Sequence, residues 1–311
     1  MNNQVKSISV VIPTYNRGAI LLDTIRMLLA QVDRAEQILI VDQTDYASGD
    51  EVALSLQSLH TNKEIVWIRL AQPSIPAAMN RGLIDASSEY VLFLDDDIEI
   101  RSGFIAQHRQ ALRNADFCGH VGQIIQPWQS VVTLKNYSPD TGINRDIAFP
   151  FNSDKEQLIH NCMAGNLCVA RDQAIDVGGF DERFSQVAYR FETEFCRRLM
   201  HASGHAFKFV PTPSINHLKL STGGTRSSAR DHLTSFSSAH SVGDYYFAMQ
   251  HFRLHGDLLQ VCTYISKRLL QSCLSKFYLS DPWWIPVRLF SECKGLIRAI
   301  VKTIKGPSYI G

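Results

Sequence analysis

The 311-residue sequence has almost no net charge, no long apolar run and no paired cysteine motif. A formal charge of +1 at pH 7 gives no overall attraction to nucleic acid, so we expect no nucleic-acid partner. No eighteen consecutive residues are apolar, so we expect no helix that spans a bilayer and a protein that is soluble or lies on a membrane. Seven cysteines without a CxxC pair argue against a disulfide framework and a structural zinc site, and favour a reducing, cytoplasmic setting.

Familiar ligand-binding motifs are also missing. Neither GxxxxGK(S/T) nor GxGxxG occurs, which excludes a P-loop and a dinucleotide-binding fingerprint. An EF-hand calcium loop that began at Asp95 would need glycine at its sixth position and glutamate at its twelfth, but those positions hold Ile100 and Ala106. We find no internal repeat and no low-complexity tract.

What is present is a regular alternation of strand and helix patterns up to residue 94. Apolar runs predict four buried strands, at residues 8–13, 37–45, 64–70 and 90–94. Helical spacing and helix-start signals predict helices between them, at residues 19–32, 49–59 and 76–87. Such alternation is typical of right-handed βαβ units, so we expect an α/β fold with a mostly parallel central sheet flanked by helices.

From about residue 117 the alternation is lost. Residues 126–160 are loop-like and suit a segment that covers a substrate. Short helices are predicted within 170–184 and at 192–203, and one or two strands within 205–220. We divide the chain into a first domain, residues 1–225, and a helical, basic amphipathic region, residues 226–311.

The helical region is locally basic. Residues 261–311 contain eight Lys or Arg against one Asp and one Glu, a local net charge of +6, and Trp283 and Trp284 precede an amphipathic stretch. One interpretation is contact with a membrane surface through residues 261–305. The other is a helical cap that packs on the first domain and exposes a solvated basic face.

Polar side chains follow the predicted strands where these end. Residues 14–16 follow the first strand, Asp42 the second and residues 95–97 the fourth. The carboxyl ends of parallel strands share one sheet edge, where ligands bind. A buried carboxylate costs several kcal/mol without a positive partner, and a strand-end Asp-x-Asp can hold one divalent cation with phosphate oxygens and water. The alternative is a solvated, charged turn.

Ordered motifs between about residues 6 and 220 resemble those of the family 2 glycosyltransferases. They are VVIPTYNR, ILIVDQTD, AAMNRGLIDASSEYVLFLDDDIEI, GNLCVARDQAIDVGGFDERF, an acidic helix start before CRRL, and a late NHL. The resemblance implies a GT-A fold that uses nucleotide-diphosphate sugars. It leaves the C-terminal quarter uncovered.

The resemblance implies roles for several strand-end residues. Pro13, Thr14 and Tyr15 would line the pocket for the nucleotide base, and Asp42 would accept a hydrogen bond from that base, of UDP or dTDP type. Arg81 would reach a phosphate or the strand-end carboxylates; the alternative is a solvated helix arginine.

The same resemblance implies a metal site. Asp95 would lie against the ribose or sugar, and Asp97 would bind Mn²⁺ or Mg²⁺, which bridges the diphosphate. We place Asp96 with the donor-binding residues, although its side chain is expected to point away or to make a structural bond. His217 would complete the metal site, unless it is a packed or capping residue.

The resemblance also implies an acceptor side. Gly165 and Asn166 would shape it, and Asp181 is a candidate contact to the donor sugar or the acceptor.

The family's catalytic base belongs to an acidic pair before a helix that ends in RL. Here the sequence YRFETEFCRRL puts Phe191 and Glu192 at the pair, so the resemblance assigns the base to Glu192, with Glu194 as fallback. The alternative for Glu192 is a first-turn acid that stabilises the helix dipole.

These inferences predict an inverting, metal-dependent hexosyl- or deoxyhexosyltransferase of polysaccharide or glycoconjugate biosynthesis, acting on a saccharide or lipid-linked acceptor. We expect it in the cytoplasm, or peripherally on the inner membrane face. The alternative is a catalytically silent relative that binds nucleotide sugar or serves as a membrane-associated assembly partner, as the altered acidic pair and the basic tail would allow.

Overall fold

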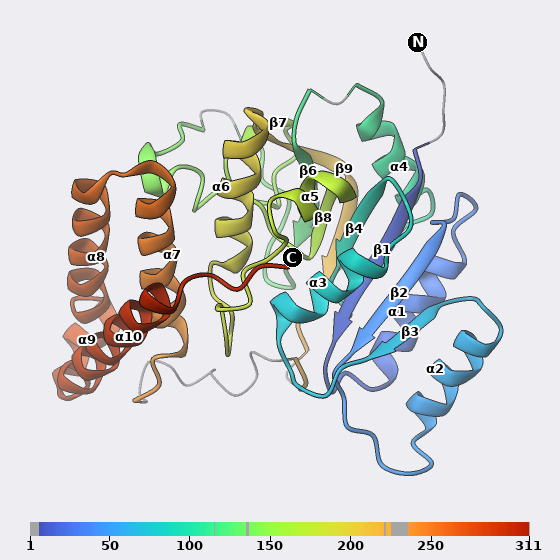
Figure 1. Cartoon of the computed structure of the whole chain (residues 1–311), viewed down its shortest axis with the longest axis horizontal. Coiled ribbons are helices and arrows are strands. Elements are labelled where there is room, and N and C mark those ends of the chain that lie inside the picture. Colours follow the sequence, from blue (N-terminus) through green and yellow to red (C-terminus); the bar gives the residue numbers. More distant parts are fainter. Residues whose placement is uncertain (1–5, 115, 135–136, 221, 225–235, 311) are drawn as a thin grey trace.

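The computed structural model describes residues 6–114, 116–134, 137–220, 222–224 and 236–310. Its centre is a nine-stranded sheet in the order β3-β2-β1-β4-β8-β6-β9-β5, with β7 paired to β9 (Figure 1). One continuous apolar core runs from the first strand, at Ile8, into the C-terminal helices, at Ala299.

The N-terminal half has the predicted alternation. The strands are β1 (Ile8–Thr14), β2 (Gln37–Asp42), β3 (Val66–Arg69) and β4 (Tyr90–Leu94), and they are mutually parallel. The helices are α1 (Ala19–Leu29), α2 (Glu51–Thr61) and α3 (Ile75–Asp85). Local chemistry sets the helix starts, because Asp50 and Ser74 cap α2 and α3 through their side chains.

The second half makes the sheet mixed. Its strands are β5 (Ile98–Ile100), β6 (Gly119–Ile125), β7 (Gln157–Ile159), β8 (Asn166–Ala170) and β9 (Phe207–His217). Its helices are α4 (Phe104–Ala111), α5 (Arg171–Asp176) and α6 (Phe191–Ser203), with 3₁₀ turns η1 (Leu112–Asn114) and η2 (Gly142–Asn144). Strand β8 runs antiparallel to both neighbours, and residues 207–217 form one strand. The expected α/β sheet with flanking helices is confirmed, with the parallel order confined to β1–β4 and the β6–β9 pair.

The C-terminal region is helical, as predicted. It contains α7 (Ala239–His255), α8 (Leu258–Cys273), α9 (Lys276–Ser280), the turn η4 (Pro282–Trp284) and α10 (Ile285–Lys305). These helices stand beside α6, at the end of the molecule opposite α2 (Figure 1). Helix α7 lies against α6 and α10 and buries Tyr245, Tyr246 and Phe247. None of the helices in the described part of the chain combines the length and the apolar character that crossing a membrane requires.

After α10 the chain returns to the first domain. The amide of Glu182 donates to Ser308 O at 2.9 Å, and the amide of Ile310 donates to Gly178 O at 3.0 Å. Gly178 has a positive φ of 87°, and a Cβ there would lie 2.7 Å from Tyr309 Cβ. Residues 306–310, the C-terminal strap, therefore pack against the turn that follows α5. The proposed domain boundary at residue 225 adjoins residues 225–235, which lie outside the described chain, and it stays a prediction.

Candidate active site

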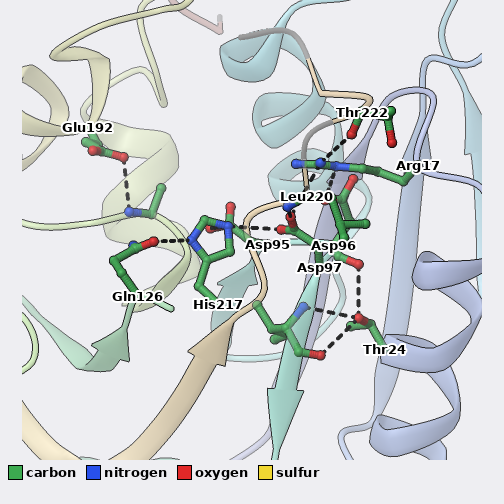
Figure 2. Close-up of polar contacts among 12 residues, drawn as sticks. Arg17, Thr24, Asp95, Asp96, Asp97, Gln126, Glu192, His217, Leu220 and Thr222 are labelled. Atoms are coloured by element: carbon green, nitrogen blue, oxygen red, sulfur yellow. Dashed lines mark hydrogen bonds and ion pairs between the residues drawn. The ribbon is translucent and has the colours of Figure 1, made fainter. Parts of the chain in front are cut away.

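The aspartate cluster lies in the turn between β4 and β5 (Figure 2). Asp97 is fully buried and Asp96 nearly so, whereas the side chain of Asp95 is 43% exposed. Arg17 reaches the cluster from the segment after β1, with its Nε 2.8 Å from Asp96 Oδ1 and its Nη1 3.4 Å from Asp97 Oδ2. The chain itself thus supplies part of the positive charge that adjacent carboxylates require. The solvated-turn alternative is wrong, because two of the three carboxylates are buried.

His217, the last residue of β9, faces this cluster. Its Nε2 lies 3.0 Å from Asp97 Oδ1 and 3.7 Å from Asp95 Oδ2, and its Nδ1 donates to Gln126 Oε1 at 3.0 Å (Figure 2). The register of β5 with β9, which pairs Ile98 with His217, brings together residues 120 apart in sequence. The structure therefore joins His217 to Asp97, as predicted, while a metal-binding role for the pair stays a prediction.

The residues of the cluster differ in the direction of their pKa shifts. Burial raises the pKa of Asp96 to about 7, against the opposing charge of Arg17. Burial would also raise the pKa of Asp97, but the hydrogen bond and charge of His217, with Arg17 and the Leu220 amide, outweigh it and lower that pKa. Burial would lower the pKa of His217, but its bond to Asp97 raises it. The buried Asp97 and the partly buried His217 therefore favour the charged pair.

The residues present fit a divalent ion with two protein ligands. Adjacent ligands of an octahedral ion with bonds of about 2.1 Å lie roughly 3 Å apart, and the Asp97 Oδ1 to His217 Nε2 distance is 3.0 Å. Gln126 holds Nδ1 of His217, which leaves Nε2 as the ligand atom of the neutral ring. The half-exposed Asp95 carboxylate lies beside them.

A second group of metal-ligating side chains lies inside the core. Within the described residues, three such side chains come within 4.8 Å of one another only at His108, His120 and Cys168, all fully buried. His108 Nδ1 and His120 Nε2 are 2.8 Å apart, a hydrogen-bond distance. This group is therefore already satisfied in part without an ion.

The predicted base-binding residues lie at the same sheet edge. Strand β1 ends with Pro13 and Thr14, and Tyr15 follows it. Thr14 pairs in register with Asp42, which is fully buried at the end of β2. Since β2, β1 and β4 are adjacent and parallel, Asp42 and the aspartate cluster end neighbouring strands on one edge.

Protein donors hold the Asp42 carboxylate. Oδ1 accepts from the amide of Thr44 at 2.9 Å, and Oδ2 accepts from Trp67 Nε1 at 3.0 Å. Each oxygen keeps a lone pair, so these bonds fix the carboxylate without filling it. Its role toward a base stays a prediction.

Arg81 does not reach the strand-end carboxylates. Its Nε lies 2.6 Å from Asp85 Oδ2 one turn along α3, and its side chain is 48% exposed. The prediction of that contact is wrong because the i,i+4 partner on the same helix is closer. The arginine that makes the contact is Arg17.

Glu192 lies in the first turn of α6 and is partly buried. Its Oε2 accepts from the amide of Ala164 at 3.1 Å (Figure 2). The next residue, Gly165, contacts Asp95, since a Cβ there would lie 2.4 Å from Asp95 Oδ2. Two adjacent loop residues thus connect Glu192 to the aspartate cluster. Catalysis by Glu192 stays a prediction.

The fallback base is held elsewhere. Glu194 is buried, and both of its oxygens accept from Arg198, at 2.6 and 2.8 Å. Burial raises the pKa of Glu194, although Arg198 opposes this. Phe191 is also buried, against Phe180. The assignment of Glu194 as fallback is therefore wrong, because a bidentate ion pair occupies its carboxylate.

Two further acceptor-side predictions are corrected. Asp181 is fully buried, and it accepts from the amides of Arg183 and Ser308 at 2.9 and 2.8 Å and from the Tyr246 hydroxyl at 2.7 Å. It therefore anchors the C-terminal strap rather than facing a sugar. Asn166 is also fully buried, and it donates to backbone carbonyls of β6 and β9.

Sequence reasoning missed three contributors to the cluster. Arg17 stands directly after the first strand, so the rule that singled out Tyr15 could have found it. Gln126 and the amide of Leu220, which donates to Asp97 Oδ2 at 3.1 Å, carry no sequence signal. They reach the site only through the pairing of β6 with β9.

The chain resembles proteins of known class. A curated relative, the GalNAc(5)-diNAcBac-PP-undecaprenol beta-1,3-glucosyltransferase of Campylobacter jejuni, is 31% identical over 102 residues, 32% of this chain and 32% of the relative. The chain spans about a third of the length of the first curated relatives it matches.

Solved structures share the fold. TarS residues 1–349 of S. aureus in complex with UDP-GlcNAc superposes with a TM-score of 0.60 at 16% identity, covering 96% of this chain and 88% of that one. The mannosyltransferase PcManGT of Pyrobaculum calidifontis, in complex with GDP-Man and Mn²⁺, gives a TM-score of 0.53 at 13% identity, covering 97% and 88%.

The family model described as glycosyl transferase family 2 matches residues 9–177, more than half of the chain. The GT-A fold is confirmed, and the chain belongs to glycosyl transferase family 2.

Proposed function

We propose that this chain transfers a hexose or deoxyhexose from a UDP- or dTDP-type sugar to a saccharide or lipid-linked acceptor, with inversion, in polysaccharide or glycoconjugate biosynthesis. The observation that carries the proposal is the setting of Asp95. This half-exposed carboxylate has the buried Asp97–His217 pair on one side and the Gly165 loop, which leads to Glu192, on the other. The donor complexes of TarS and PcManGT support a nucleotide-sugar donor.

Asp97 and His217 would hold Mn²⁺ or Mg²⁺. When bound, the ion supplies Lewis-acid neutralisation of the charge that develops on the leaving nucleotide diphosphate. Gln126 orients the His217 ring, and Arg17 fixes Asp96 behind the site. The Mn²⁺ complex of PcManGT supports this assignment.

Glu192 would act as the general base. It removes the proton of the acceptor hydroxyl while that oxygen bonds to the anomeric carbon and the bond from carbon to the diphosphate breaks, which gives inversion and releases the nucleotide diphosphate. The bond from the Ala164 amide fixes the Glu192 carboxylate beside the loop that contacts Asp95. This position beside the 164–165 loop, which contacts Asp95, supports the active enzyme over the silent relative.

A lipid-linked acceptor and a membrane-surface location receive support from α10. Trp283, just before this helix, is 88% exposed. Large apolar side chains are also exposed along the helix at helical spacing, namely those of Phe290, Ile297, Val301 and Ile304. An apolar stripe of this kind beside lysines suits an anionic lipid surface. The Campylobacter relative, by its name, acts on an undecaprenol-linked substrate.

The packed-cap interpretation also receives support, because half of the basic residues counted in 261–311 bind the protein itself. Arg268 pairs with Asp244 and Arg288 with Glu292. Arg298 donates to Ser238, and Lys302 to Ser185. The lysines of this region that make no hydrogen bond or ion pair with other described residues, and so are open to lipid, are Lys267, Lys276, Lys294 and Lys305.

The test is turnover of UDP-, dTDP- and GDP-sugars with Mn²⁺, with EDTA, and in Asp97→Asn. Because the metal is expected to supply several kcal/mol, transfer should fall at least about 10³-fold in the variant and in EDTA. Asn keeps an oxygen for the Leu220 amide, so thermal unfolding should show a folded variant. Full activity in a folded Asp97→Asn would contradict the metal assignment.

A further inference from the structure

A second polar cavity lies away from the aspartate cluster. It has a volume of about 410 Å³ and is bounded by α6, α7, the start of α8 and the segment from Gly142 to His160. Helices α6 and α7 stand side by side there (Figure 1). Its polar lining is almost entirely cationic or nitrogen-bearing: Arg145, Arg197, His160, His201, His251, His255 and Gln260. The volume falls in the range of small-molecule sites.

The floor of the cavity holds unsatisfied nitrogen atoms. Arg197 is 8% exposed and His251 is 6% exposed. Neither Nε of Arg197 nor Nδ1 of His251 has a hydrogen-bond partner among the described residues. A buried polar group without a partner costs about 1–3 kcal/mol, so two such groups on residues that line one cavity favour a ligand there.

The rim adds donors that are exposed. The guanidinium of Arg145 has no partner among the described residues, and His201 and His255 stack edge to face at 5.6 Å. Gln260 uses its Oε1 to accept from the amide of Ile143 at 3.1 Å, which leaves its NH₂ group free to donate.

The acids nearby are already engaged. Asp257, the only carboxylate in the lining, caps α8 by accepting from the amide of Gln260 at 2.9 Å. Asp146, behind the lining, accepts from the Tyr137 hydroxyl and from the amide of His160. In the described lining, two arginines and four histidines therefore stand against one carboxylate, that of Asp257. Asp146 lies beside one of these histidines, 3.2 Å from Nδ1 of His160.

The titration behaviour of the histidines agrees with this excess of positive charge. Burial lowers the pKa of His251 to about 4, helped by His255 and Arg197. Burial, His201 and Arg197 lower the pKa of His255. A bound anion would reverse the repulsive part of both effects.

We propose that this cavity binds a phosphate group, either inorganic phosphate or a phosphate ester. Arginine forks with histidine and amide donors are the groups that recognise phosphate oxygens. The cavity shares α6 and the 160–164 loop with Glu192, and Arg197 lies five residues, about 7.5 Å of helix rise, beyond Glu192. A phosphate carried by the acceptor could thus be held while its sugar reaches Glu192; this use, unlike the site itself, rests on the proposed function.

The experiment is calorimetric titration of the full chain, in EDTA and without donor, at constant ionic strength. The two probes are inorganic phosphate and monobutyl phosphate. We expect saturable one-site binding of at least one probe, weakened about tenfold in Arg145→Gln, which loses one charge-assisted contact. Arg145 is exposed, so the variant should fold.

The matched control is Arg26→Gln, which removes the same charge from a side chain on α1 that is 69% exposed and should bind like wild type. Tighter binding of monobutyl phosphate would indicate an ester as the source, and equal or tighter binding of inorganic phosphate would indicate the free ion. No saturable binding up to about 10 mM, or equal affinity in the two variants, would overturn the proposal. The assay needs no turnover, so its outcome is independent of whether the transferase proposal holds.

Discussion

The aspartate cluster and the cationic cavity differ in how their charge is balanced. At the sheet edge, Arg17 and His217 already stand against the buried Asp96 and Asp97. At the cavity, Arg145, Arg197 and four histidines stand against a single carboxylate in the described lining, that of Asp257. Both are concentrations of one charge type, but the first is balanced from within to a larger extent than the second.

The difference teaches how to interpret charge clusters. A cluster of carboxylates suggests a bound cation. Here Arg17 supplies part of the positive charge, so the cluster alone does not require a metal. Unsatisfied buried donors are the more direct sign of a ligand, because nothing in the described chain compensates their desolvation.

The largest effect should come from Glu192, which lies on the helix that lines the cavity and bonds to the loop that contacts Asp95. Glu192→Gln should lower kcat by about 10²–10⁴-fold, the usual contribution of a general base, while donor binding is kept. Glu194→Gln, two residues away, should instead lower stability, because it leaves Arg198 buried without its charge partner. Steady-state kinetics and urea unfolding of both variants separate the two roles. Equal kcat in Glu192→Gln and wild type would favour the silent relative.

Arg17→Met should break the internal neutralisation of the aspartate cluster. Because the side chains of Arg17 and Asp96 are 14% and 7% exposed, the free energy of unfolding should drop by about 3 kcal/mol. Arg26→Met, whose pair with Asp23 is exposed, should change it by less than about 1 kcal/mol. Chemical unfolding measures both. A drop no larger than that of the control would mean that the cluster does not depend on Arg17.

Acid should lower the free energy of unfolding of the chain through a histidine at the cationic cavity. The pKa of His251 is about 4 in the folded chain and ordinarily 6.5, so the folded state favours the neutral ring. The contribution of this histidine to the free energy of unfolding is present above pH 6.5 and is lost as the pH falls toward 4. The loss between pH 6.5 and 5 is about 2 kcal/mol.

His251→Gln should remove this part of the stability loss at low pH. His205→Gln, at an exposed histidine, should keep it. Unfolding free energies at the two pH values decide the matter, and identical pH slopes in both variants would contradict the prediction.

The smallest effect concerns α10. Binding to anionic vesicles should weaken several-fold as salt rises, because four lysines of this region have no bond to other residues of the described chain. Ile297→Asp should reduce co-sedimentation, whereas Val32→Asp, at a site 96% exposed beyond α1, should not. Equal behaviour of the two variants, or no binding at all, would leave the packed cap as the sole role of these helices.

Sequence patterns predict the first half of the fold because its strands and helices depend on signals within each segment. Strands β1–β4 and helices α1–α3 follow from apolar runs, caps and spacing within each segment. The β5–β9 pairing could not be predicted, because three-residue β5 has no periodic signal of its own and its partner lies far along the chain. The Asp97–His217 contact depends on that pairing, and only the family resemblance suggested it.

The ion pair of Glu194 with Arg198 was predictable. The two residues stand at i,i+4 in a helix that the sequence predicts, a spacing that favours such a pair. Motif matching placed Glu194 as an alternative base because it considers position and not neighbouring charge. The cationic cavity could not be predicted, since its lining comes from four separate segments.

The C-terminal strap has a consequence for the order of events during synthesis. Asp181 and the turn after α5 receive their partners from residues 306–310, and Tyr309 lies over Arg198, 4.2 Å from ring centre to guanidinium carbon. A ribosome that has finished the sheet has therefore not yet made the segment that completes the surroundings of α6. The helix that carries Glu192 can reach its final packing only after about a hundred further residues have emerged, so α6 in a nascent chain would lack its complete surroundings until late in translation.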